Sequence, residues 1–124
     1  MSLQLVHLVE DDSVVRAMLT RLLESAGYTV ASYESGRALL DAIDTLKSGC
    51  ILLDVRMPEP DGFAVRSALA RRGVDLPVVM MSGSGDLTLL ARNAGARDFM
   101  QKPFGRAELL SVLGQLAAVE HGHA

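Results

Sequence analysis

The stretch CILLDVRMPEPDG, residues 50–62, passes from apolar to charged to turn-forming residues without interruption. Residues 50–53 are all apolar and lead directly into Asp54, and two prolines and Gly62 follow. A short, continuous apolar run that is closed by turn residues is typical of a strand buried on both faces. The sequence therefore predicts a central strand that ends on the carboxylate of Asp54, with proline fixing the shape of the turn behind it.

Similar apolar runs alternate with segments of helical periodicity along the chain. We expect strands at 3–9, 28–33, 50–55, 76–82 and 98–101. We expect helices at 12–27, 35–46, 62–73, 86–94 and 105–120. Strand–helix units that recur about every 25 residues predict an α/β domain, in which a parallel sheet carries helices on both faces.

The expected helices also carry start and stop signals. Asp12 or Ser13 is suited to cap the start of the first helix, and Gly27 is suited to end it. Ser35 is suited to cap the second helix, and Gly73 to end the third. These signals support the alternation that the apolar pattern predicts.

The bulk composition limits the kind of protein. The chain has 124 residues, of which 49% are hydrophobic and 22% charged, and its formal net charge is −3. This suits one domain, which we expect at 1–120 with a C-terminal tail at 121–124. The acidic balance gives no general attraction to nucleic acid or to an anionic membrane, and no apolar run is long enough to span a bilayer. Cys50 is the single cysteine and is expected to be a small buried residue. Because one cysteine allows no internal disulfide, the simplest location is the cytoplasm.

Three acidic residues follow the predicted strands at one edge of the sheet. Glu10 and Asp11 lie just beyond the first strand, and Asp54 ends the third. In an open parallel sheet, ligands bind outside the carboxyl ends of the strands. If the first and third strands are central neighbours, the three carboxylates converge at one edge. Carboxylates so close together repel one another, and a cation relieves that repulsion. Oxygen ligands alone favour Mg²⁺ above Ca²⁺ here, and the backbone carbonyl of Arg56 could complete the site.

Two further polar residues end neighbouring strands. Ser82 ends the fourth strand with a hydroxyl, and Lys102 follows the fifth with a compact positive charge. Together with the acids and a metal ion, these groups are suited to phosphoryl transfer, in which a carboxylate attacks phosphorus in line. Asp54 is the expected nucleophile because it stands alone at the end of a central strand, whereas Glu10 and Asp11 are better placed to hold the ion.

Each of these residues also has an ordinary structural explanation. An acid after a strand is usually a loop residue or a helix cap, and a serine there is usually a turn residue. A lysine before a proline is usually a surface residue. The joint occurrence of acids, hydroxyl and lysine at the ends of four strands favours the functional interpretation.

Four ordered motifs carry a resemblance to a known family. They are VHLVEDDSVVR (6–16), LLDVRMPEPDG (52–62), PVVMMSGSGD (77–86) and GARDFMQKPF (95–104). On these motifs the chain resembles the receiver domain of bacterial two-component response regulators over nearly its whole length. It looks most like receivers found ahead of LuxR-type DNA-binding domains. The resemblance implies a flavodoxin-like receiver fold, with five parallel strands in the order 2-1-3-4-5.

The resemblance implies a phosphorylation site and a metal site at the acidic residues. Asp54 would be the phosphoacceptor, and Mg²⁺ would be the cofactor. Asp11 and Asp54 would bind the ion through their side chains, Arg56 would bind it through its carbonyl, and Glu10 mainly through water. Glu10 replaces the more usual aspartate of the family and should keep the ion.

The resemblance also implies a conformational switch beside the phosphorylation site. Ser82 would be the switch hydroxyl and Phe99 the switch aromatic, although Phe99 could equally be an ordinary core residue. Lys102 would contact the phosphoryl group, ahead of a cis bond to Pro103. The stretch 82–95 is shorter than the family pattern leads us to expect, so we predict a shortened or partly irregular fourth helix. We therefore expect signalling through a modified face of that helix, or through another face such as the first helix.

The partners that follow from this resemblance are proteins. The phosphodonor would be a sensor histidine kinase or a phosphotransfer protein. Phosphorylation would shift the balance between two packings, and the altered surface would act on a downstream protein or on an output domain that this chain lacks. The chain would be a stand-alone regulator or a fragment of a longer one. A phosphorylation-dependent dimer is compatible with this scheme, whereas direct binding to nucleic acid or membrane is not expected.

Two other functions compete with a phosphorylatable receiver. A pseudo-receiver would bind proteins without accepting phosphate, but the acids, Ser82 and Lys102 are all in place. A phosphatase with an aspartyl nucleophile would usually carry a second acid two residues later, where this chain has Arg56. We therefore expect no enzyme in the usual sense, but a domain that catalyses only its own aspartyl phosphorylation and dephosphorylation.

Overall fold

The computed structural model describes residues 4–82, 98–101 and 105–122, with side chains described for 4–81 and 105–114. The elements, in chain order, are β1 (Leu5–Val9), α1 (Ser13–Ser25), β2 (Thr29–Tyr33), α2 (Gly36–Asp41), the 3₁₀ helix η2 (Ile43–Thr45), β3 (Cys50–Asp54), α3 (Gly62–Arg71), β4 (Val78–Ser82), β5 (Asp98–Gln101) and α5 (Arg106–Gly122). The expected alternation of strands and helices is thus present in the described part of the chain.

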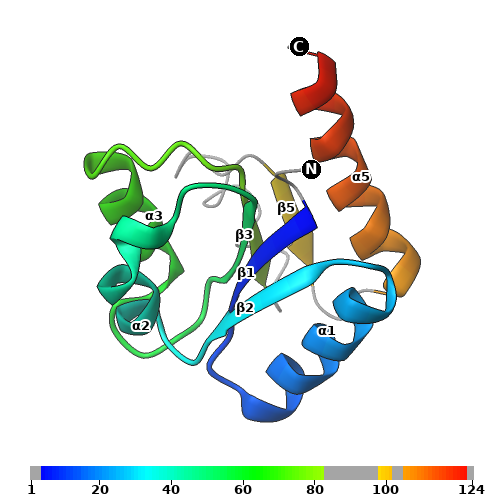
Figure 1. Cartoon of the computed structure of the whole chain (residues 1–124). Helices are drawn as coiled ribbons and strands as arrows, with labels where there is room; N and C mark the ends of the chain where they lie inside the picture. The colour runs from blue at the N-terminus through cyan, green and yellow to red at the C-terminus, as the bar shows by residue number, and fades with distance from the viewer. Residues whose placement is uncertain (1–3, 83–97, 102–104, 123–124) are drawn as a thin grey trace.

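The strands form one five-stranded parallel sheet in the order β2-β1-β3-β4-β5. Helices α1 and α5 cover one face of the sheet, and α2 and α3 cover the other (Figure 1). The predicted fold class and strand order are therefore confirmed. Because β1 and β3 are central neighbours, the acids that follow them in sequence lie at the same edge of the sheet.

Two aliphatic cores lie on the two faces of this sheet. On the α1 and α5 face, the buried residues are Val6, Leu8, Leu19, Leu23, Cys50, Leu52, Val79, Met81, Leu109 and Leu113. On the α2 and α3 face, they are Val9, Leu39, Ile43, Leu46, Ile51, Leu53, Val55, Met57, Val65, Leu69, Val78 and Met80. Residues 50–53 of β3 alternate between the two cores, and the whole strand is buried, as its unbroken apolar run predicts.

Side-chain caps start the helices at the expected places. The Asp12 carboxylate accepts hydrogen bonds from the backbone N–H groups of Val14 and Val15, at 2.9 and 3.1 Å, so Asp12 rather than Ser13 is the N-cap of α1. Ser35 caps α2 as predicted, through a 3.0 Å bond from Ala38 N–H. Asp61, which the sequence analysis did not single out, caps α3 in the same way.

The helix expected at 35–46 is divided in two. Helix α2 ends at Asp41, and η2 continues from Ile43 to Thr45 with tighter bonding. Both the backbone N–H and the hydroxyl of Thr45 donate to the Ala42 carbonyl, at 2.9 and 2.6 Å, which favours the three-residue turn over a continuing α-helix. The helix expected at 86–94 and the prediction that it is shortened lie outside the described residues.

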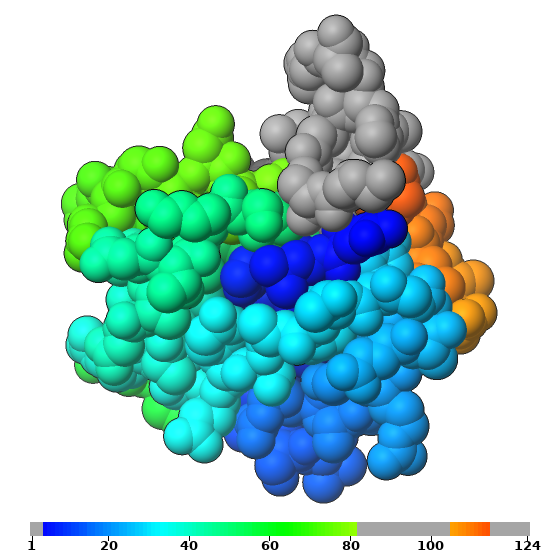
Figure 2. All heavy atoms as spheres, viewed as in Figure 1, coloured from blue at the N-terminus to red at the C-terminus, as the bar shows by residue number. Residues whose placement is uncertain are grey.

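The remaining helix ends differ from the expected bounds by one or two residues. Helix α5 continues to Gly122, slightly beyond the expected end of the domain. The space-filling view shows green atoms of the α2 and α3 side on the left and orange atoms of α5 on the right, with dark-blue atoms of β1 facing the viewer between them (Figure 2). Within the described residues, the helices are too short or too polar to cross a membrane.

Candidate metal centre

Three carboxylates meet at the carboxyl edge of the sheet. Asp54 ends β3, and Glu10 directly follows β1, whose last residue Val9 pairs with Leu53 of β3. The cluster consists of Glu10, Asp11 and Asp54, and one carboxylate oxygen from each lies within 4.8 Å of those of the other two. The structure therefore brings together the acids that the sequence analysis selected.

Burial makes this acidic cluster unusual. The side chains of Glu10 and Asp54 are only 1% and 4% exposed, whereas Asp11 is exposed. Carboxylates rarely lie so deep in a fold, because removing an ionised group from water is costly. Like charges at this separation also repel one another. An oxygen-lined site with two buried acids and one solvent-facing acid fits a hard divalent cation that keeps some of its water, as Mg²⁺ does.

The loop that carries Glu10 and Asp11 is held by several hydrogen bonds. The backbone N–H of Glu10 donates to the Tyr33 carbonyl at 3.1 Å, which ties the loop to the end of β2. The N–H of Asp12 donates to Oε2 of Glu10 at 3.2 Å. From the first turns of α1, Nη1 of Arg16 donates to the Glu10 carbonyl at 2.7 Å. Arg16 is not among the site residues predicted from the sequence, where its only signal is its place on the helix that follows the acids.

Asp54 is held by the chain on both sides of it. The N–H of Val55 continues the sheet by donating to the Met81 carbonyl at 2.9 Å, and the N–H of Arg56 donates to Oδ1 of Asp54 at 3.3 Å. Gly62, at the start of α3, donates from its N–H to the Val55 carbonyl at 3.0 Å. The turn of residues 55–61 is thereby closed against the end of β3. The metal-binding role of the Arg56 carbonyl stays a prediction.

The other predicted site residues can be placed only through the backbone. Ser82 ends β4, where it pairs with Gln101 of β5, and its neighbour Met81 pairs with Asp54. The position of Ser82 is therefore at the same edge of the sheet as Asp54. Phe99 lies in β5, beside Met80 of β4. The side chains of Ser82 and Phe99, and all of Lys102 and Pro103, lie outside the described residues.

The chain thus combines a parallel sheet of order 2-1-3-4-5 with an acidic cluster at the carboxyl ends of β1 and β3. The family model described as "Response regulator receiver domain" matches residues 6–114. The chain belongs to this family. The expectation drawn from the four sequence motifs is thus confirmed, and the chain is a receiver domain of the two-component response regulators, a signalling module.

Curated relatives of this receiver domain are response regulators. Transcriptional regulatory protein FixJ of Azorhizobium caulinodans is 42% identical over 110 residues, which are 87% of this chain and 52% of that protein. Response regulator protein TmoT of Ectopseudomonas mendocina is 38% identical over 87% of this chain and 50% of its own length. The chain thus spans about half the length of the curated relatives it matches. One of these relatives is a transcriptional regulatory protein and the other a response regulator protein, which agrees with the resemblance to receivers of response regulators.

Solved structures support the same fold. Full-length FixJ from B. japonicum has a TM-score of 0.85 and 34% identity, over 92% of this chain and 57% of that chain. The chemotaxis protein CheY4 of Vibrio cholerae has a TM-score of 0.82 and 28% identity, over 90% of this chain and 97% of that chain. The receiver fold therefore occurs both as part of longer chains and as nearly the whole of a solved chain.

Proposed function

We propose that this receiver domain, residues 1–120, accepts a phosphoryl group on Asp54 from a histidine kinase or phosphotransfer protein. The observation that carries the proposal is the convergence of Glu10, Asp11 and Asp54 beyond the two central strands. Of the three, Asp54 is the nucleophile because it ends a strand that is buried along its whole length and so has a fixed direction. Glu10 and Asp11 belong to one short loop and are suited to hold a cation.

The proposed reaction needs few protein groups. A carboxylate oxygen of Asp54 attacks the phosphorus of a phosphohistidine, an O–P bond forms, and the P–N bond breaks with its electron pair left on the imidazole. Asp11 and Asp54 would hold Mg²⁺ through their side chains, the Arg56 carbonyl would complete the site, and Glu10 would act through water. When bound, the ion neutralises charge on the phosphoryl oxygens. Later attack of water on the aspartyl phosphate releases phosphate, which is the domain's own dephosphorylation.

The remaining roles concern the phosphoryl group after transfer. Lys102 would contact a phosphoryl oxygen, and the Ser82 hydroxyl would move to bond another. Phe99 would fill the space that Ser82 leaves, so that the surface on the β5 side changes its affinity for a partner. That partner is a downstream protein or an output domain, in a protein that acts in the cytoplasm. A phosphorylation-dependent dimer is compatible with the same surface change.

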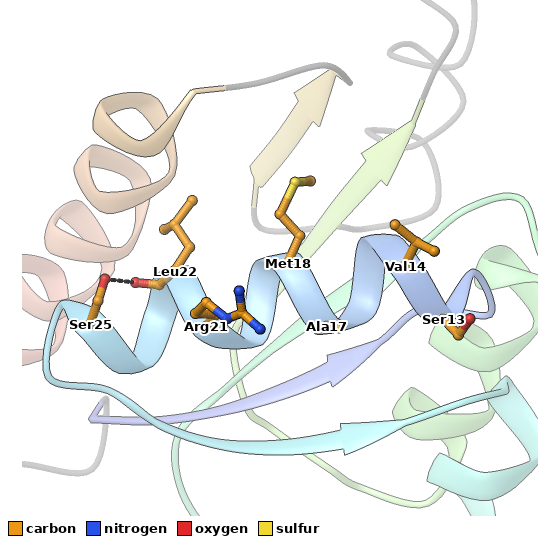
Figure 3. Close-up of a pocket in the computed structure, with 7 residues that line it drawn as sticks. All are labelled: Ser13, Val14, Ala17, Met18, Arg21, Leu22 and Ser25. Atoms are coloured by element: carbon orange, nitrogen blue, oxygen red, sulfur yellow. Dashed lines mark hydrogen bonds between the residues drawn. The ribbon is translucent and has the colours of Figure 1, made fainter.

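Helix α1 offers a docking surface for the phosphodonor. Val14 and Met18 are large apolar side chains that are 75% and 58% exposed. Together with Leu22, they project from one side of α1, with Arg21 and Ser25 beside them (Figure 3). Exposed apolar groups that cluster in this way mark interaction sites.

The position of this α1 surface indicates its occupant. It begins in the first turn of α1, directly after the loop that carries Glu10 and Asp11. A protein that places a phosphohistidine over Asp54 must cover the surface around the acidic cluster, and α1 continues from that cluster. We therefore assign the surface to the histidine kinase or phosphotransfer protein.

Phosphorylation by a small donor tests the proposed function. The purified chain is incubated with acetyl phosphate and Mg²⁺, and its intact mass and the release of phosphate are followed. A receiver gains one phosphoryl group that is lost slowly, and it gains none when EDTA replaces Mg²⁺. A pseudo-receiver gains none under any condition. A phosphatase releases phosphate from the donor through many turnovers without a stable mass gain, and either of these last two results would contradict the proposal.

A further inference from the structure

We propose that Arg16 is a positioning residue that sets the Mg²⁺ affinity of the acidic cluster by anchoring the main chain at Glu10. The proposal rests on the function above, because it assumes that the cluster binds Mg²⁺. It concerns a side chain outside the predicted set of ligands. Arg16 lies on α1, is partly buried, and donates from Nη1 to the Glu10 carbonyl at 2.7 Å.

This contact closes a ring of bonds around the loop. The backbone N–H of Arg16 donates to the Asp12 carbonyl at 2.9 Å as part of α1, and the Asp12 N–H donates to Oε2 of Glu10 at 3.2 Å. The Arg16 side chain extends back past the N-cap, Asp12, and reaches Glu10, the residue directly before the exposed acid Asp11. The Arg16 guanidinium therefore links the start of α1 to the end of β1, and Glu10 and Asp11 lie in the short loop between these two elements.

The bond also has the chemistry of a strong anchor. A hydrogen bond from a charged donor is stronger than one between neutral groups, and 2.7 Å is short for an N–H···O contact. The carboxylates of Glu10, Asp11 and Asp54 repel one another when no cation lies between them. A loop that was free to move would relax outward under this repulsion, and binding of the ion would then have to reorder it. Because the Arg16 guanidinium is bonded to the Glu10 carbonyl, the loop is already in place before the ion binds.

The positioning role makes a prediction opposite to that of simple electrostatics. A positive charge near a cation site repels the cation, so removing the charge of Arg16 would tighten Mg²⁺ binding if charge alone mattered. If Arg16 acts by holding the loop, removing its side chain weakens Mg²⁺ binding, as loss of supporting contacts does in other metal sites. The sign of the change in affinity therefore decides between the two effects.

The test compares Mg²⁺ dissociation constants, measured by isothermal titration calorimetry, for the wild-type chain and the variants Arg16→Met, Arg16→Lys and Arg71→Met. Arg71 is the matched control, an exposed arginine at the end of α3. We expect Arg16→Met to weaken binding roughly tenfold, Arg16→Lys to weaken it less because the ammonium can still donate to the carbonyl, and Arg71→Met to leave it unchanged. Unchanged or tighter binding by Arg16→Met would overturn the proposal.

A second measurement separates positioning from general loss of structure. The rate of phosphorylation by acetyl phosphate is followed against Mg²⁺ concentration, well below the unfolding temperature of each variant. We expect Arg16→Met to need more Mg²⁺ but to approach the wild-type rate at saturation, whereas a damaged fold would lower the saturated rate. If Arg16→Met does not fold, the comparison of Arg16→Lys with wild type decides, and equal Mg²⁺ affinity would count against the proposal. A wild-type chain that does not bind Mg²⁺ at all would instead contradict the proposed function.

Discussion

Gly62 lies directly against the main chain of Asp54. A Cβ atom built on Gly62 would lie 2.5 Å from the carbonyl oxygen of Asp54 and 2.7 Å from Cα of Val55, closer than such atoms approach in proteins. The first residue of α3 thus packs on the backbone of the proposed phosphoacceptor without room for a side chain. The glycine is required here by close approach, and the direction of Asp54 depends on it.

The first prediction concerns this contact. Gly62→Ala must push α3 away from the end of β3, and we expect it to lower the free energy of unfolding by about 1–3 kcal/mol. It should also slow phosphorylation, since Asp54 loses its fixed position. Urea unfolding and the rate of reaction with acetyl phosphate provide the two readouts.

Gly114→Ala is the matched control for that substitution. Gly114 lies in α5 with open space where its Cβ would be, so alanine should raise the free energy of unfolding by about 0.5–1 kcal/mol through helix propensity. Its phosphorylation rate should equal that of wild type. If Gly62→Ala were as stable and as reactive as the wild-type chain, the contact between Gly62 and the Asp54 backbone would not be needed for either property.

The second prediction concerns the repulsion within the acidic cluster. Asp54→Asn removes one of three clustered charges, and in EDTA we expect it to raise the free energy of unfolding by on the order of 1 kcal/mol. Added Mg²⁺ should raise the melting temperature of the wild-type chain more than that of this variant, because binding to the folded state stabilises it. Asp75→Asn, at an exposed position, should change neither quantity. Equal stabilisation of Asp54→Asn and wild type by Mg²⁺ would argue against a site that includes this carboxylate.

The third prediction concerns the α1 surface. Met18→Glu places a charge on this exposed apolar surface, and we expect it to slow transfer from a protein phosphodonor roughly tenfold or more. The reaction with acetyl phosphate should be unaffected, since that donor needs no docking surface. Ser67→Glu on α3 is the control, because Ser67 is exposed on the opposite side of the sheet. Equal loss with both donors would mean that the substitution damages the site itself.

The fourth prediction concerns alkaline pH. Burial raises the pKa of the Tyr33 phenol, and burial followed by the influence of Cys50 raises the pKa of Tyr28. Because each pKa is higher in the folded than in the unfolded chain, both tyrosines contribute stability that is complete below about pH 10 and is lost as the pH rises through their folded values. Urea unfolding at increasing pH should show this loss, and Tyr33→Phe should make it less steep. A free energy of unfolding that does not change as the pH rises above about 10 would contradict the raised pKa values of the two tyrosines.

The strands and the acidic cluster could be predicted because short stretches of sequence carry the signals for them. The apolar run before Asp54 indicates a doubly buried strand, and β3 is buried on both faces. Glu10 and Asp11 could be joined to Asp54 because parallel strands bring their carboxyl ends to one edge. Residue types and chain direction were enough for these inferences once the first and third strands were taken as neighbours.

Other features depend on contacts that no local pattern reveals. Arg16 looks like any helix-surface arginine until α1 is docked beside the end of β1. The need for glycine at position 62 appears only when α3 is packed on β3. The division of the second helix follows from the bonds of Thr45 to Ala42, which compete with a regular helix that propensity alone would favour.

The position of the phosphoryl group tests the central claim most directly. The chain is phosphorylated with acetyl phosphate and Mg²⁺, reduced with borohydride, which converts an aspartyl phosphate to homoserine, and mapped by tandem mass spectrometry. The account predicts homoserine at position 54 alone, and none in Asp54→Asn or without Mg²⁺. Homoserine at Asp11 or another acid, or an unmodified chain in the presence of both donor and metal, would contradict it.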